Sequence, residues 1–436
     1  MVRPVRFTAT TVASIQLLCQ AAPVLGAPEH ASNLTIAFGN NASGNNFHAS
    51  PSVTTVALAW SDPLSDTATG NAYNLQLSLV NNLASTNVHA YVTGLDSAGT
   101  LVFMQPSGGW VHPSNPTPGV PQAVTADIAI LLGSEGSSTN IVLPGYVTSG
   151  RVYIADGTLD FFTIRGQSGP ALIQPGSVNP IDTSTETNWG FVELTTSVAD
   201  GVFADLTHVD FVGLPLGLTL ENADGTTQSA PGMPRSGVAD VCRGLRAQAK
   251  IDGQPWDRLC LNDADSNLLR VLSPPNYLGF NGDAAFGDYF TAYVAAAGLV
   301  DCTVHPASAE LTCTGDNRGY AQPSAADILG CNSGPFTIFD SDNDIHKAVV
   351  PRLCAAFNRA TYLHAGGDQQ PTDNARAYYT ANPSNWYSAV VHAIDIDHRG
   401  YAFAYDDVGP DGGRDQAGVV SSHDPTKLTI IVGGPR

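Results

Sequence analysis

Short alternating apolar runs fill residues 72–235 and restrict this part of the chain to a β architecture. Among them are YNLQLSLVNN, NVHAYVTGLD, NIVLPGYV and GRVYIADGTLDFF, separated by turns rich in Gly, Asn, Asp and Pro. Alternation with a period of two is typical of strands that bury one face. Many such strands at close spacing predict a β-sandwich or β-barrel, so we expect a mainly β fold.

The pattern changes to helices after residue 235. SGVADVCRGLRAQAKI, SAADILGC and DIHKAVVPRLCAAFNRATYL predict helices, several with Ser or Asp as the N-cap. SAVVHAIDI, YAFAYDDVG and KLTIIVGG, nearer the C-terminus, predict strands again. We therefore expect residues 236–390 to form a mixed α/β domain inserted into the β-domain, with residues 391–436 returning to the β-domain.

The N-terminus predicts a secreted, extracellular protein. Residues 1–26 contain two arginines, a short apolar run and small residues before Ala27, as signal peptides do. Residues 27–71 form an extension rich in Ser, Thr, Asn and Ala, with glycosylation acceptors at Asn33 and Asn41. The chain has 19 Lys and Arg against 39 Asp and Glu. This balance disfavours binding to nucleic acid or to an anionic membrane, and suits a neutral partner such as a polysaccharide.

Cysteine usage indicates disulfides within the predicted insertion. Seven cysteines are present; Cys19 falls in the predicted leader, and the other six lie between residues 242 and 354. An even number of cysteines in a secreted chain indicates disulfides. Many connectivities are open, and we predict the sequential pairs Cys242–Cys260, Cys302–Cys313 and Cys331–Cys354.

Residues 188–220, NWGFVELTTSVADGVFADLTHVDFVGLPLGLTL, predict two strands joined at Asp200 and Gly201. The alternation places Phe191, Glu193 and Thr195 opposite Val192 and Leu194, and it places His208 and Asp210 opposite Val209 and Phe211. With this turn Glu193 lies opposite His208, and Asp210 is its diagonal neighbour at roughly 7–8 Å. Inverting glycosidases keep their two carboxyl groups roughly 6.5–9.5 Å apart. The alternative is two exposed strand carboxylates on a very acidic protein.

Two possible metal motifs fail on residue identity or geometry. Asp340, Asp342 and Asp344 imitate an EF-hand loop, but the required Gly and Glu are replaced by Ile345 and Pro351. A helix N-terminus with favourable acids explains them better. His392, Asp395, Asp397 and His398 form a second group, yet positions 392 and 395 of a strand point to opposite faces. We expect no metal and no organic cofactor, and the sequence has no G-x-S-x-G, P-loop or G-x-G-x-x-G motif.

NWGFVELT followed by HVDFVGLPLGLTL resembles the signature of glycoside hydrolase family 64. Members of this family are secreted β-1,3-glucanases that release laminaripentaose and are related to thaumatin-like proteins. VNNLASTNVHAYVTG, GFNGDAAFGDYF, GYAFAYDDVGPDGG and AGVVSSHDPTKLTIIVGG agree in order along the chain. The resemblance extends from about residue 72 to the C-terminus.

The resemblance implies a thaumatin-type β-barrel or sandwich, an inserted mixed α/β domain and a wide groove between them. It also implies inversion, with Glu193 as the general acid and Asp210 as the general base. Asp182 and Thr195 fall on positions that line the family's sugar sites. Asp406 and Asp407 lie in a YDD stretch like one in thaumatin-like proteins, where acids line the cleft; their alternative role is in a turn.

The neighbours of these residues suggest further roles. Trp189 and Phe191 would exclude water from Glu193 and favour its protonated form. Trp189 is either a sugar-stacking residue or a core residue. His208 would help Asp210 stay ionised.

Three functions follow as alternatives. The first is an inverting β-1,3-glucanase, endo- or exo-acting, that is a monomer and binds β-1,3-glucan. The second is a non-catalytic, thaumatin-like β-glucan-binding protein, which would be expected to lack one of the two acids. The third, a membrane-active protein, is disfavoured by the low Lys and Arg content.

Overall fold

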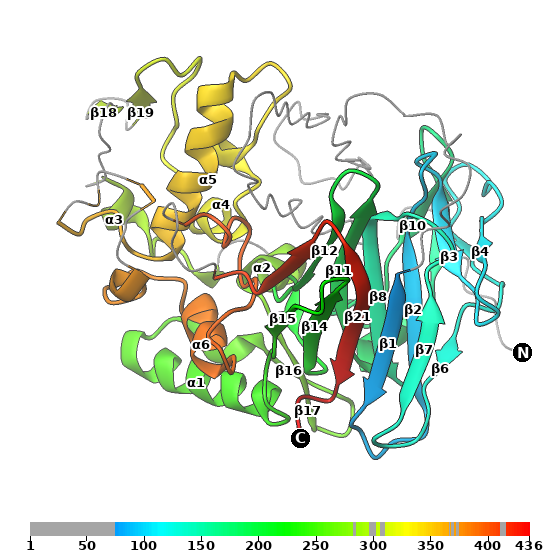
Figure 1. The fold of residues 1–436 in the computed structure, drawn as a ribbon. Helices are drawn as coiled ribbons and strands as arrows, with labels where there is room; N and C mark the ends of the chain where they lie inside the picture. Colours follow the sequence, from blue (N-terminus) through cyan, green and yellow to red (C-terminus); the bar gives the residue numbers. More distant parts are fainter. Residues whose placement is uncertain are drawn as a thin grey trace, which may run out of the picture.

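The computed structural model describes residues 75–436, except 282–284, 296–301, 306–309, 366, 368–369, 372–374 and 410–415. The predicted leader, the N-terminal extension and both glycosylation acceptors lie outside the described residues. A region of β-sheets lies beside a region that holds the α-helices (Figure 1). None of the helices in the described ranges has the length and apolar character needed to cross a membrane.

Two large sheets pack against each other. The first has five strands in the order β15 (Thr227–Ala230), β14 (Leu216–Asn222), β21 (Pro425–Val432), β1 (Gln76–Asn81) and β7 (Ser138–Val142). The second has eight, in the order β20 (Val419–Ser422), β12 (Gly201–Leu206), β11 (Asn188–Ser197), β8 (Thr148–Asp156), β2 (Val88–Leu95), β3 (Leu101–Met104) and β4 (Trp110–Val111), with β6 (Ile130–Leu131) pairing with β2. Their shared core includes Leu79, Val152, Val192, Leu218 and Ile430.

Alternation along β11 divides its side chains between two environments. Val192 and Leu194 belong to the core between the two sheets. Trp189 and Phe191 lie on the opposite face, in an aromatic cluster with Phe211. The predicted faces of this strand are therefore confirmed, as is the prediction of a mainly β fold with helices.

Smaller elements complete the described fold. One small sheet contains β5 (Gln122–Ala123), β9 (Phe162–Arg165) and β10 (Pro170–Ile173); a second contains β13 (Phe211–Val212), β17 (Leu268–Leu272) and β16 (Cys260–Asn262); a third contains β18 (Cys302–His305) and β19 (Glu310–Cys313). The α-helices are α1 (Gly237–Asp252), α2 (Pro274–Asn281), α3 (Thr291–Ala295), α4 (Ala325–Gly330), α5 (Asp344–Asn358) and α6 (Trp386–Ile394). Short 3-10 helices are η1 (Thr183–Glu186), η2 (Pro255–Leu259), η4 (Gly334–Phe336) and η5 (Ala375–Ala377).

The C-terminal strands belong to the two large sheets. β21 lies between β1 and β14, parallel to β1, and β20 pairs with β12. The elements from α1 to α6 therefore fall between β15 and β20 in the sequence. Two strand predictions are wrong: most of residues 388–396 belongs to α6, and residues 401–409 form turns. A short apolar run fits a buried helix as well as a strand, and here Asn385 provides a helix N-cap.

Disulfides cross-link the helical region. The predicted pairs Cys242–Cys260 and Cys331–Cys354 are confirmed. For the third predicted pair, the backbone register of β18 and β19 places Cys302 opposite Cys313.

The register of the β11–β12 hairpin differs from the predicted one. Ser197 pairs with Gly201, so Glu193 lies opposite Asp205 and not opposite His208. The loop is residues 198–200, because Asp200 and Ser197 bond to each other across it and Gly201, with φ 70°, already begins β12. β12 ends at Leu206, so Asp210 lies outside this sheet and the diagonal-neighbour spacing does not apply.

Gly201 provides a test of this register. A Cβ at Gly201 would overlap the carbonyl oxygen of Ser422 on β20, and its positive φ disfavours L side chains. Gly201→Ala is expected to lower the free energy of unfolding by more than about 2 kcal/mol. Gly225→Ala is the matched control, because Gly225 has φ +83° but a Cβ added there would meet no atom within 4 Å. Equal losses in chemical denaturation would contradict the close approach of β20.

Candidate active site

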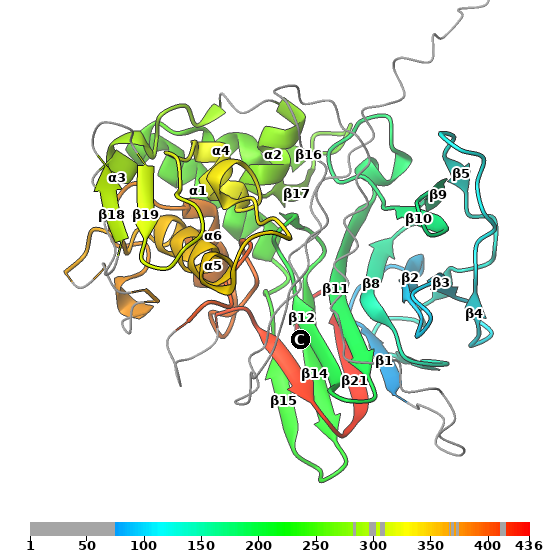
Figure 2. The same cartoon turned by 90° about the horizontal axis from the view of Figure 1, so that it is seen from above.

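Four strands of the eight-stranded sheet place a polar row on the face opposite the inter-sheet core. β12, β11, β8 and β2 lie side by side in this order (Figure 2). Thr93 on β2 lies opposite Arg151 on β8, Arg151 lies opposite Glu193 on β11, and Glu193 lies opposite Asp205 on β12. Opposite residues of an antiparallel pair share a face, so these four side chains form one row.

Arg151 brings the two predicted carboxylates together. Its Nη2 and Nε donate to Oε1 of Glu193 at 2.8 and 3.0 Å. Its Nη1 lies 3.4 Å from Oδ2 of Asp210 and also donates to Oε1 of Gln174. The guanidinium carbon lies 4.2 Å above the centre of the Phe191 ring. The residues predicted as acid and base thus meet at one guanidinium, although they belong to different elements.

The site is partly closed to solvent and strongly polarised. The side chains of Arg151, Glu193 and Asp210 are 8%, 19% and 11% exposed. Burial opposes the charge of Arg151, but the carboxylates of Glu193 and Asp210 outweigh it and raise its pKa above the ordinary value. Burial also raises the pKa of Tyr153 to about 12, so its phenol stays neutral beside the cation. Arg151 is therefore a permanent cation in this site.

The helical region fixes the segment that carries Asp210. The backbone N–H of Ser273 and Nδ2 of Asn276 donate to the carbonyl oxygen of Asp210, at 3.0 and 2.6 Å. Tyr387 of α6 donates its hydroxyl to the carbonyl of His208 at 2.6 Å. The N–H of His208 donates in turn to the carbonyl of Tyr401. Asp210 is therefore held at the boundary between the sheets and the helices.

His208 does not have the predicted role. Its Nε2 lies 3.8 Å from Oδ1 of Asp395. Burial, and then the charge of His392, lower the pKa of His208 to about 4, so the ring is neutral near pH 7. A neutral ring does not help Asp210 stay ionised, whereas the cationic Nη1 of Arg151 lies 3.4 Å from Oδ2 of Asp210. Burial, with the charges of Asp397 and Asp406, raises the pKa of Asp395 well above its usual range.

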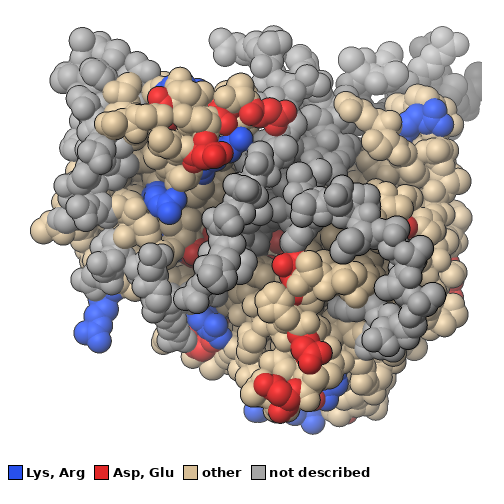
Figure 3. Space-filling view, turned by 45° about the horizontal axis from the view of Figure 1, so that its top comes forward, with Lys and Arg blue, Asp and Glu red and all other residues tan. Residues whose placement is uncertain are grey.

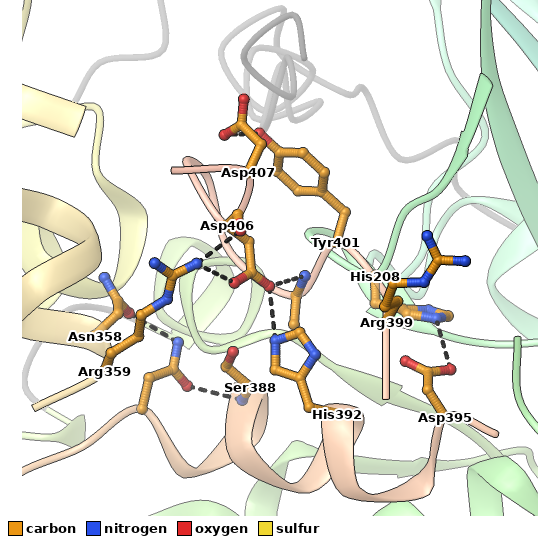
Figure 4. Close-up of polar contacts among 12 residues, drawn as sticks. His208, Asn358, Arg359, Ser388, His392, Asp395, Arg399, Tyr401, Asp406 and Asp407 are labelled. Carbon is orange, nitrogen blue, oxygen red and sulfur yellow. Dashed lines mark hydrogen bonds and ion pairs between the residues drawn. The ribbon is translucent and has the colours of Figure 1, made fainter. Parts of the chain in front are cut away.

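Asp406 lies at the centre of a buried polar network (Figure 4). Nη2 of Arg359 donates to its Oδ1 at 3.0 Å, while Nε2 of His392 and the N–H of Ala402 contact its Oδ2 at 2.9 and 3.0 Å. Burial works against the carboxylate, but these partners lower the pKa of Asp406 below its usual value. With 1% of its surface exposed, Asp406 stabilises the 401–407 turn and is not accessible to a ligand.

The other predicted contact residues differ in their accessibility. Trp189 is 3% exposed and donates Nε1–H to the carbonyl of Ser184, so it is a core residue and cannot stack on a sugar. Asp182 is half-buried and caps η1 by accepting from the N–H of Ser184. Thr195 is half-buried, one step beyond Glu193 on the same face of β11. Asp407 is half-buried and accepts a hydrogen bond from the hydroxyl of Tyr401 at 2.9 Å.

The metal motifs rejected from the sequence have other partners in the structure. Asp342 pairs with Arg318, and Asp344 lies in the first turn of α5. His392 contacts Asp406, and Asp397 pairs with Arg399. Within the described ranges, no group of three or more His, Cys, Asp or Glu side chains could hold a metal ion. On the face in Figure 3, the described Lys and Arg side chains are dispersed and form no extended patch.

Arg151, Gln174 and Asp205 were not predicted from the sequence. A signal was available for Arg151, because it is the one charged residue within the buried stretch of β8, GRVYIA. An arginine in a buried strand needs anionic partners. Asp205 could be found only with the correct hairpin register, which a three-residue loop sets.

Arg151 should be essential for the stability of the site. Arg151→Met keeps the volume of the side chain but removes the guanidinium that contacts Glu193 and Asp210. We expect the free energy of unfolding at pH 7 to fall by about 3–5 kcal/mol. Arg243→Met is the control, since the Arg243–Asp240 pair is on the surface and should contribute at most about 1 kcal/mol. Similar losses in urea denaturation for the two variants would show that Arg151 is not a buried ion-pair partner.

Asp395 should destabilise the fold at neutral pH. A carboxyl group whose pKa rises on folding costs stability as the pH rises above its unfolded value, about 4. Asp395→Asn is therefore expected to raise the free energy of unfolding at pH 7 by about 1 kcal/mol or more, with the gain disappearing near pH 3. Asp397→Asn, which removes the partner of Arg399, should show no such gain. Stability curves of wild type and variant that run parallel with pH would refute this.

Comparison with known proteins shows that Arg151, Glu193 and Asp210 lie in the part of the chain that matches a protein family. Residues 73–432 match the family model of the glycoside hydrolase family 64 β-1,3-glucanases. A glucan endo-1,3-beta-glucosidase of Cellulosimicrobium cellulans and one of Arthrobacter sp. (strain YCWD3) are each 25% identical over 355 residues, covering 77% of this chain. The match spans 61% of the length of these two relatives.

Solved structures of similar proteins show the same fold. A laminaripentaose-producing β-1,3-glucanase in complex with laminaritetraose superposes with a TM-score of 0.68 at 23% identity, covering 83% of this chain and 99% of the other. A family 64 β-1,3-glucanase domain from Clostridium beijerinckii gives a TM-score of 0.62 at 19% identity, with 84% and 100% coverage.

Proposed function

Because the chain belongs to glycoside hydrolase family 64, we propose that it is a secreted β-1,3-glucanase that hydrolyses its substrate with inversion. Two curated relatives carry the name glucan endo-1,3-beta-glucosidase, which supports endo action on β-1,3-glucan. A neighbouring structure is described as laminaripentaose-producing, so short oligosaccharides such as laminaripentaose are the expected products.

The observation that carries this proposal is the convergence of Glu193 and Asp210 on Arg151. Two carboxyl groups at one site, each partly accessible to solvent, provide the acid and the base that glycoside hydrolysis requires. The non-catalytic alternative would be expected to lack one of them.

The proposed reaction assigns one step to each carboxyl group. Glu193 donates its proton to the glycosidic oxygen, and the bond from this oxygen to the anomeric carbon breaks. Asp210 accepts a proton from the water that attacks the anomeric carbon on the opposite face. The new hydroxyl group therefore has the α configuration. Arg151 holds Glu193 and Asp210 in place without itself exchanging a proton.

Other features of the proposal concern substrate and location. Thr195, on the face of Glu193, and Asp182, at the start of η1, are proposed as sugar contacts, and Asp407 as a residue at the rim. The domain division is proposed as an inserted α/β domain, residues 236–390, beside a thaumatin-like β-domain and a substrate groove. The predicted leader supports secretion, and a monomer is proposed.

Activity on laminarin tests the assignment of the acid and the base. Glu193→Gln and Asp210→Asn should each lower kcat by about 10²–10⁴-fold, because each removes one proton transfer. Glu221→Gln is the matched control, since Glu221 lies on the surface beside Lys427. NMR of the early products should show the α-anomer first.

Two results would overturn the proposal. A β-anomer formed first would mean retention of configuration. Binding of laminarin without any release of sugar by the wild type would favour the non-catalytic β-glucan-binding function.

A further inference from the structure

Gln174 is an exposed residue at the site that the proposed reaction does not use. It follows β10 directly and lies between the buried residues Ile173 and Pro175. Its Oε1 accepts a hydrogen bond from Nη1 of Arg151. An exposed side chain therefore reaches the same buried guanidinium that contacts the two proposed catalytic carboxyl groups.

The chemistry of Arg151 fixes the orientation of the Gln174 amide. A guanidinium has N–H donors and no acceptor, whereas an amide has one acceptor oxygen and one NH₂ donor group. The amide oxygen must face Arg151, because the opposite orientation would place N–H groups against each other. The NH₂ group of Gln174 is therefore the end of the amide that is directed away from the guanidinium.

The Gln174 amide is a close neighbour of the proposed base. The nitrogen of Arg151 that donates to Gln174 also lies 3.4 Å from Oδ2 of Asp210. Two acceptor oxygens beside one nitrogen are at most about 6 Å apart. A sugar unit that is attacked by water from Asp210 therefore also comes within reach of the Gln174 side chain.

The backbone that carries Gln174 is held in place. The N–H of Gly176 donates to Oδ2 of Asp182 at 2.8 Å. Nη1 of Arg270 donates to the carbonyl of Ser177 at 3.1 Å. Together with the bond to Arg151, these contacts restrict the side chain of Gln174 before any ligand arrives. A restricted side chain loses less conformational entropy on binding, so it contributes more to affinity.

A glucan needs hydrogen-bond donors from this site as well as acceptors. Sugar hydroxyl groups both donate and accept, whereas ionised carboxylates such as Asp210 and Asp182 only accept. The side chain of Arg151 is 8% exposed, and its N–H groups are directed to protein acceptors. Gln174 offers an N–H donor on an exposed side chain next to the acids.

We propose that Gln174 is a substrate-binding residue: Arg151 fixes its amide oxygen, and its NH₂ group donates to a hydroxyl oxygen of the glucose unit that binds beside Asp210. This inference rests on the proposed β-1,3-glucanase function. It adds a neutral donor to the acidic residues of the site, and it gives Arg151 a second task, the orientation of a side chain that contacts the sugar.

Binding and kinetics of Gln174→Met test this role, since Met keeps the length of the side chain but has no N–H. Calorimetry with laminaritetraose in the Glu193→Gln variant, which lacks the proposed acid, should show a Kd raised by about 3–10-fold when Gln174→Met is added. In the otherwise unchanged chain, KM on laminarin should rise by a similar factor while kcat stays within about twofold. Gln228→Met is the matched control, because Gln228 is an exposed glutamine of β15 that bonds to the backbone of Ser421, and it should change neither value.

The outcomes separate a sugar contact from a structural role. An unchanged Kd would overturn the inference, and a fall in kcat at unchanged Kd would mean that Gln174 only supports Arg151. If Gln174→Met does not fold, Gln174→Ala takes its place with the same expectations. If laminarin is cleaved and the Gln174 variants bind normally, this inference alone fails. If laminaritetraose is bound but laminarin is not cleaved, the proposed hydrolysis fails and the Kd comparison still decides the role of Gln174. If the chain neither binds nor cleaves, both fail.

Discussion

The buried guanidinium of Arg151 is the interaction on which the site depends. It joins Glu193, on a central strand, to Asp210, on a segment that has already left the sheet. Isolated charges are strongly disfavoured away from water, and the guanidinium of Arg151 compensates part of this cost for both carboxylates. The Phe191 ring beneath the guanidinium limits its movement and excludes water from that side. One side chain thus sets the distance between two acids that no regular secondary structure connects.

The helical region is needed for the same geometry. Asp210 lies outside the large sheets, and its carbonyl is held by Ser273 and Asn276. Two positions earlier, the backbone of His208 is held at both polar groups: its carbonyl accepts from the hydroxyl of Tyr387, and its N–H donates to the carbonyl of Tyr401. A disulfide-linked helical region therefore orients the proposed base, whereas the sheets orient the proposed acid. The distance between the proposed acid and base therefore depends on how the helical region packs against the sheets.

The sequence was sufficient for the strand faces of β11 and for the C-terminal return of the chain, because alternation and run length carry that information. The sequence did not determine the hairpin register, since the residues around Asp200 and Gly201 are compatible with a two-residue loop as well as with the observed three-residue loop. The helix α6 was mistaken for a strand because its apolar run is short. The family resemblance pointed to Glu193 and Asp210, which the structure brings together at Arg151, although the spacing argument for them was wrong. Arg151 and Asp205 depend on pairing between distant strands, which periodicity does not show.

Two arginines lie against the aromatic cluster of Trp189, Phe191 and Phe211, and their partners give them different roles. Arg270 is fully buried with its guanidinium over the rings of Trp189 and Phe211, and it donates to the backbone carbonyls of Ser177 and Thr185. Because burial dominates, its pKa falls to about 9. Arg151 faces carboxylates instead, and its pKa rises. Arg270, with neutral carbonyl partners, holds the loop that carries Asp182 in place. Arg151, with anionic partners, compensates the charges of Glu193 and Asp210. The proposed active site is therefore distinguished from the adjacent core by the charge of what each arginine contacts, and not by burial, since both side chains are almost completely buried.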